Sequence, residues 1–89
     1  MSNIQVKSLG DNRYEVNVAA HTPTTHVVTV PADYAAKLTN GAASTETLVE
    51  KSFDFLLERE PNTSILRSFE LSVIGRYFPD YERTIKTYF

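Results

Sequence analysis

The sequence of 89 residues contains no cysteine and only three glycines. Without cysteine the chain has no disulfide bonds, no thiolate zinc or iron–sulfur site and no cysteine nucleophile. The three glycines are scattered, so they do not form the glycine-rich loop that cradles a phosphate group. The absence of cysteine fits a reducing compartment, and the sequence therefore predicts a cytoplasmic protein.

Long apolar runs and a charge excess are also missing. No window approaches the ~18 apolar residues of a membrane span, and the opening residues MSNIQVKSLG lack the segments of a signal peptide. The net charge is −2, from nine basic and eleven acidic residues scattered along the chain. No overall field attracts nucleic acid or anionic lipid. We therefore expect no membrane partner and little affinity for nucleic acid.

The length of the chain predicts a single domain over residues 1–89 with one hydrophobic core. A chain of this size buries only roughly 60 to 65% of the surface that its unfolded form exposes. Much of that burial must come from the five Phe and five Tyr side chains. Association into a homodimer is a natural way to bury more surface.

Three segments in the first third of the chain alternate between apolar and polar residues, as half-buried strands do. They are IQVKSL at 4–9, RYEVNV at 13–18 and HVVTV at 26–30. The Gly-Asp-Asn cluster at 10–12 is typical of a hairpin turn. The sequence therefore predicts a three-stranded antiparallel β-meander over residues 4–30, with one face in solvent.

Residues 31–89 are predicted to be helical, which makes the fold class α+β, with four to five short helices packed on one face of the sheet. ADYAAKLT at 32–39 contains good helix formers. The following pair, Asn40 and Gly41, commonly ends a helix.

A longer, central helix is predicted to begin at a cap formed by Ser44 or Thr45 and to end near Glu60, because Pro61 cannot continue it. Its apolar stripe consists of Val49, Phe53, Leu56 and Leu57.

Three short helices are expected after Pro61, in the segments ILRSF, VIGRYF and DYERTIKTYF. Gly75 and Pro79 argue against one continuous helix.

No group of residues has the pattern of a catalytic or metal site. His21 and His26 lie five residues apart, a spacing that suits neither a strand nor a helix metal pair. Glu50, Asp54 and Glu58 follow one helix face, as a solvated acidic stripe does. We therefore expect no enzyme activity, no cofactor and no catalytic, cofactor-binding or metal-binding residues.

The sequence at 63–78 has the rhythm of a helix-turn-helix, in which Ser72 would cap a recognition helix carrying Arg76 and Tyr77. This is one alternative function, nucleic-acid binding. The segment contains few basic residues for phosphate contacts, which favours a structural helix pair instead. Its core residues would be Leu66, Phe69, Leu71, Ile74 and Phe78.

A second alternative is a small enzyme or ligand carrier with a site between the sheet and the helices. It would involve His26, Tyr14 or Tyr34. Such a site requires a pocket with converging polar groups.

Aromatic and arginine side chains gather at the C-terminal end of the chain, and these types dominate the energetics of protein interfaces. The favoured interpretation is therefore a non-enzymatic protein-interaction or regulatory module that binds itself or another protein. The candidate partner-binding residues are Arg76, Tyr77, Tyr81, Arg83, Tyr88 and Phe89.

The pattern FLLEREP, followed by ILRSF and RYFPDYER, resembles a group of short bacterial proteins of uncharacterised function. The resemblance extends over most of the chain, roughly from Tyr14 to Arg83. It implies a bacterial cytosolic protein and transfers no activity, cofactor or catalytic residue.

Overall fold

The alternating segments of the first third form antiparallel strands in the computed structural model, which describes residues 3–89. On the inner face of the sheet Val16 is paired with Val6 and His26, while Lys7 faces Glu15 across the outer, polar face. The predicted meander with one solvent face is confirmed. Its strands are β1 (Ile4–Gly10), β2 (Arg13–Val18) and β3 (Thr24–Thr29).

Helix α1 (Ala32–Thr39) has the predicted bounds, and it ends at Asn40, whose φ of 54° is left-handed. Helix α2 (Thr45–Leu57) begins where the Ser44 hydroxyl oxygen accepts a hydrogen bond from the Thr47 amide. Ser44 is therefore the residue that caps this helix.

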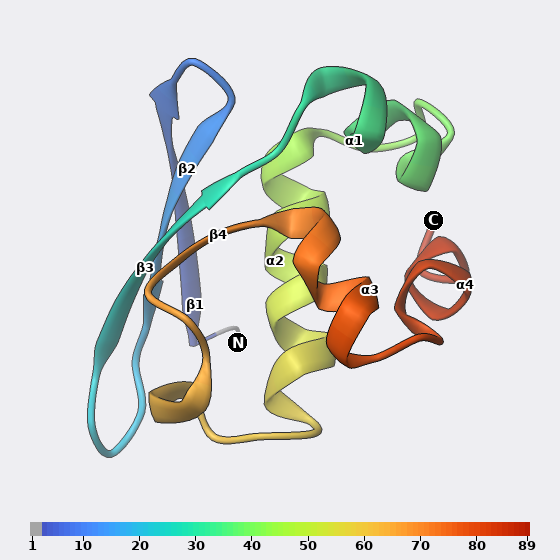
Figure 1. Cartoon of the computed structure of the whole chain (residues 1–89). Helices are drawn as coiled ribbons and strands as arrows, with labels where there is room; N and C mark the ends of the chain where they lie inside the picture. The colour runs from blue at the N-terminus through green and yellow to red at the C-terminus, as the bar shows by residue number, and fades with distance from the viewer. Residues whose placement is uncertain (1–2) are drawn as a thin grey trace.

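Helix α2 lies between the sheet and the remaining helices (Figure 1), and it buries side chains on both sides. Toward the sheet, the Phe53 ring lies 5.3 Å from the ring of His26. Toward the short helices, the Phe55 ring lies 5.3 Å from the ring of Tyr81. The expected central role of this helix is confirmed, although it ends before Glu60.

The segment ILRSF, expected to be a helix, instead leads from a 3₁₀ turn η1 (Asn62–Ser64) into a fourth strand, β4 (Ser68–Glu70). Strand β4 pairs in parallel with β3, so the sheet is mixed and has the order β1-β2-β3-β4. The Arg67 carbonyl accepts a hydrogen bond from the Val27 amide at 2.8 Å. This long-range bond to β3 replaces a local helical one, and the prediction of three strands is wrong in this respect.

The chain then forms η2 (Leu71–Val73), α3 (Ile74–Tyr77) and α4 (Tyr81–Lys86). Helix α3 ends just before Pro79, as expected. Because β4 occupies the place of the first expected helix, residues 63–78 do not form a helix-turn-helix. Within residues 3–89, no helix combines the length and the apolar character needed to cross a membrane.

Candidate functional site

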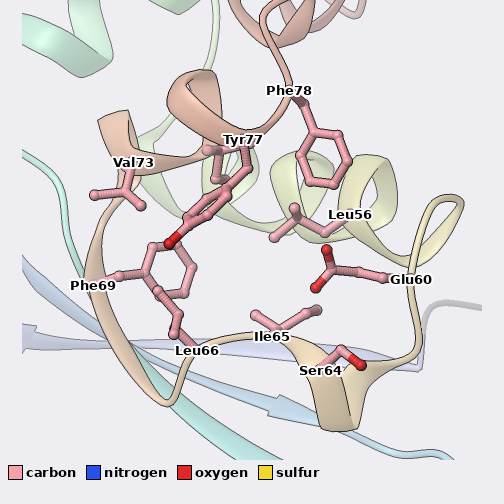
Figure 2. Close-up of a pocket in the computed structure, with 10 residues that line it drawn as sticks. Leu56, Glu60, Ser64, Ile65, Leu66, Phe69, Val73, Tyr77 and Phe78 are labelled. Carbon is pink, nitrogen blue, oxygen red and sulfur yellow. The ribbon is translucent and has the colours of Figure 1, made fainter.

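An open groove of about 210 Å³ lies between the end of α2, the η1–β4 segment and α3 (Figure 2). Three buried side chains, Leu56, Ile65 and Ile74, contribute to its lining. Phe69 and Phe78 are half-buried and line it as well. The groove therefore gives access from solvent to part of the hydrophobic core.

Two residues that line the groove expose large apolar surfaces to solvent. Leu66 is 48% exposed and Tyr77 is 67% exposed, which makes them the two most exposed large hydrophobic side chains within residues 3–89. Figure 2 shows the Tyr77 ring reaching from α3 toward Phe69. Contiguous exposed apolar surface around a hollow is typical of an interaction site.

Glu60 is the one charged residue among those that line the groove. Figure 2 shows its carboxylate pointing into the cavity, among Leu56, Ile65 and Ser64. In the part of the chain from 3 to 89, this carboxylate has no hydrogen bond and no ion pair. The groove therefore presents one unpaired negative charge on an apolar background.

A buried polar network holds the groove wall against β3. His26 is fully buried, and its Nδ1 donates to the Leu66 carbonyl at 2.8 Å. Because the carbonyl only accepts, the neutral ring leaves Nε2 to accept from the Thr24 hydroxyl, 2.9 Å away. The Asn62 amide in turn donates to Thr24 Oγ1 and to the Thr22 carbonyl, both at 2.8 Å. Every member of the network is satisfied.

The two histidines occupy different environments, so they do not form a pair. His21 is exposed in the loop before β3, whereas both ring nitrogens of His26 are occupied inside the core. Burial lowers the pKa of His26, and the positive charge of Arg67 lowers it further, against the raising effect of the Leu66 hydrogen bond.

The acidic stripe on α2 also lacks the arrangement of a metal site. Burial raises the pKa of Asp54, Lys51 lowers it, and the neighbouring Glu50 and Glu58 raise it further. Among the residues from 3 to 89, no three His, Cys, Asp or Glu side chains form a group that could hold a metal ion.

Four of the six candidate partner-binding residues are on the surface. Tyr77 lines the groove, and Arg76 precedes it on the same short helix and is exposed. Arg83 is exposed on α4, and Tyr88 is 37% exposed near the end of the chain. Of these, Tyr77 is the residue that joins a hollow in the surface.

The other two candidates belong partly or wholly to the core. Tyr81 has no exposed surface, and its hydroxyl lies 2.7 Å from Ser52 Oγ. Burial raises the pKa of Tyr81 above its ordinary range. Phe89 is half-buried and packs against the core cluster. Tyr81 is therefore unavailable to a partner.

The residues proposed for an enzyme or carrier site do not meet at the groove. Tyr14 and Tyr34 are half-buried against the core, and neither lines the groove, nor does His26. The Tyr34 hydroxyl instead donates to Glu82 Oε2 at 2.8 Å, and burial raises the pKa of Tyr34 far above its ordinary value. None of the three candidate residues therefore contributes to the lining of the groove.

A second hollow, of about 310 Å³, lies along the ends of β1, β2 and β3. Within residues 3–89 its lining contains no charged residue, and several of its side chains are amides or hydroxyls: Asn3, Gln5, Asn17, Thr24 and Thr25. Asn17 and Thr25 already bond to each other at 2.7 Å. The residues described in this hollow do not suggest a catalytic or binding role.

Comparison of the chain with protein-family models, curated proteins and solved structures gives no match. The groove is accordingly interpreted from its own side chains.

Proposed function

We propose that this protein is a non-enzymatic interaction module of a bacterial cytosol. Its groove binds a segment of a partner protein that presents a bulky apolar side chain next to a lysine or arginine. The observation that carries this proposal is the unpaired Glu60 carboxylate inside a groove whose rim exposes Leu66 and Tyr77. The cysteine-free composition supports the cytosolic location.

The size of the groove favours side chains over a whole small molecule. Ligand pockets typically have volumes of roughly 300 to 1,000 Å³, and the groove has about 210 Å³. Burial of one large apolar side chain contributes roughly 1.5 to 3 kcal/mol. An anchor residue inserted between Leu66 and Tyr77 would also remove exposed apolar surface from the protein itself.

The charge of the groove favours a cation beside that anchor. A neutral partner that covered the groove would leave the Glu60 carboxylate desolvated and unpaired, which is costly. A lysine or arginine would compensate that charge, and its attraction is stronger in apolar surroundings than in water. Glu60 therefore disfavours the binding of neutral and acidic segments.

Selection of random peptides displayed on phage, against the immobilised full chain, tests this proposal. We expect enriched peptides to share a large apolar residue next to Lys or Arg. A synthetic copy of one such peptide should bind at least about tenfold more weakly to Leu66→Ser and Tyr77→Ser by calorimetry. Tyr88→Ser, at an exposed tyrosine that does not line the groove, is the matched control and should bind normally.

Glu60→Gln tests the charge separately. It should weaken binding of the peptide that carries the cation and strengthen binding of a copy in which that cation is replaced by alanine, because the neutral copy no longer buries an unpaired carboxylate. The proposal would be contradicted if no motif is enriched, or if the Leu66→Ser and Tyr77→Ser variants bind the peptide as tightly as the native chain. Self-association in sedimentation experiments that Tyr77→Ser abolishes would also contradict it, because a second copy would then occupy the groove.

A further inference from the structure

We propose that His26 is the positioning residue of this groove: its neutral ring clamps the η1–β4 segment to β3, and acidification releases that wall. The inference rests on the proposed function only for its effect on partner binding. The clamp itself is a property of the free protein.

The clamp consists of long-range bonds between two segments about forty residues apart. His26 bonds to the Leu66 carbonyl, the Val27 amide bonds to the Arg67 carbonyl, and Asn62 bonds to Thr24. Within the turn itself the backbone bonds are local, such as that of the Ile65 amide to the Asn62 carbonyl. These bonds, together with the parallel pairing of β4 with β3, fix the position of the groove wall relative to the sheet.

The proton arrangement of the clamp suits only the neutral ring. With Nδ1–H directed at the Leu66 carbonyl, Nε2 must accept the Thr24 hydroxyl proton. A proton on Nε2 would face Thr24 Oγ1, which already accepts from Asn62, and the Thr24 hydroxyl proton would lose its acceptor. Protonation thus leaves a buried charge and a buried unsatisfied donor, each of which is costly.

Among residues 3–89, the surroundings of His26 provide no negative charge to offset that cost. The ring of His26 lies 5.3 Å from the ring of Phe53 in α2, and His26 is paired with Val16 in β2. The η1 residue nearest to its hydrogen-bond network is Asn62, which bonds to Thr24. The charged group whose field reaches the ring is Arg67, which opposes protonation. The lowered pKa of His26 agrees with this geometry.

Opening of the wall would expose the ring to water, where its ordinary pKa of 6.5 applies. The open form then binds a proton that the closed form does not. Below pH 6.5, the ratio of open to closed wall therefore rises by up to about tenfold per pH unit until the lowered pKa of the closed form is reached. The change is confined to the segment that His26 holds.

Hydrogen exchange measured by NMR tests the clamp without any ligand. After correction for intrinsic exchange rates, protection of the Val27 amide should fall between about pH 7 and about pH 5.5 in the native protein, by up to about tenfold per pH unit. The amide of Ala35, which bonds to the Pro31 carbonyl in α1, serves as the reference and should keep its protection. Constant Val27 protection, or a loss equal to that of Ala35, would overturn the proposal.

The chain has two histidines, which provides matched variants. His21→Gln, at the exposed position, should keep the pH dependence of Val27 protection, whereas His26→Gln should remove it. If His26→Gln does not fold, the titration of the His26 ring in the native protein replaces it. The loss of Val27 protection must then begin near pH 6.5 and level off at the pH where the ring of the native protein itself titrates.

Peptide binding separates this inference from the proposed function. The affinity of the selected peptide should fall with Val27 protection on acidification in the native chain and in His21→Gln. If Val27 protection falls on acidification but the peptide affinity does not change, the positioning role is overturned and the proposed function is left intact. If no peptide binds at all, the proposed function fails, while the exchange data still decide whether the clamp exists.

Discussion

The Tyr81 hydroxyl donates a hydrogen bond to Ser52 Oγ, at 2.7 Å, in the core between α4 and α2. The direction follows from the Ser52 proton, which is directed to the Leu48 carbonyl at 2.7 Å. The two hydroxyls are therefore unequal: the serine is satisfied without the tyrosine, and the tyrosine depends on the serine.

This asymmetry predicts that Ser52→Ala destabilises the protein more than Tyr81→Phe does. Loss of Ser52 leaves the buried Tyr81 hydroxyl without a partner, at a cost of about 1 to 3 kcal/mol. Tyr81→Phe removes only the donor and should cost about 1 kcal/mol or less. Urea unfolding measures both. Equal losses would show that the Ser52 proton is directed to the tyrosine instead.

The contact between α1 and α4 should make stability depend on pH. The Tyr34 hydrogen bond is the main cause that lowers the pKa of Glu82, and Lys37 adds a smaller effect. Since this pKa is below its ordinary value of 4.5, the stabilisation is complete above pH 4.5 and is lost as the pH falls through the lowered value. Tyr34→Phe should raise the pKa of Glu82 toward 4.5.

Carbon-detected NMR titration of Glu82 measures this change directly. Lys37→Gln is the comparison variant, and it should raise the pKa of Glu82 less than Tyr34→Phe does. The stability difference between Tyr34→Phe and the native chain should shrink in acid. A difference that grows as the pH falls below 4.5 would have the wrong sign.

Substitution of glycine by alanine should have opposite effects on stability at Gly41 and Gly75. Gly41 has a φ of +73°, so Gly41→Ala should destabilise the protein by about 1 to 2 kcal/mol through backbone strain. Gly75 lies in α3, with open space where a Cβ would stand, so Gly75→Ala should stabilise it by about 0.5 to 1 kcal/mol. Thermal unfolding of the two variants checks both signs.

The first turn of α2 provides a fourth pair of variants. Ser44→Ala removes the oxygen that accepts from the Thr47 amide at 3.1 Å, and should cost about 1 kcal/mol. Thr45→Ala keeps that bond and provides the control. If the two variants lose the same stability, the cap does not contribute as described.

The local signals in the sequence predict local structure well. Alternation identified β1, β2 and β3, and the Asn40–Gly41 pair marked the end of α1, because these features depend on neighbouring residues. Strand β4 was not predictable in this way. Only Phe69 of its three residues points to the core face, and its pairing with Val28 joins positions about forty residues apart.

The groove could be predicted only in part. Tyr77 was among the candidate partner-binding residues, because exposed aromatic side chains are common at interfaces. Leu66 was expected in the core, and its exposure follows from the turn into β4. Which C-terminal tyrosine is buried depends on how α4 packs against α2, and Tyr81 and Tyr77 look alike in the sequence. No pattern in the sequence pointed to Glu60, since its role depends on its carboxylate having no hydrogen bond or ion pair within residues 3–89.

The short strand β4 also bears on the solubility of the protein. Without it, β3 would be an edge strand, and its uncharged, β-branched TTHVVT sequence would offer a template for pairing to other chains. Strand β4 covers that edge with three residues, of which Ser68 and Glu70 are polar and exposed, and Arg67 precedes them. A new edge so short and so polar is a poor template for a further strand. Release of the η1–β4 segment would therefore uncover a surface on which the protein could aggregate.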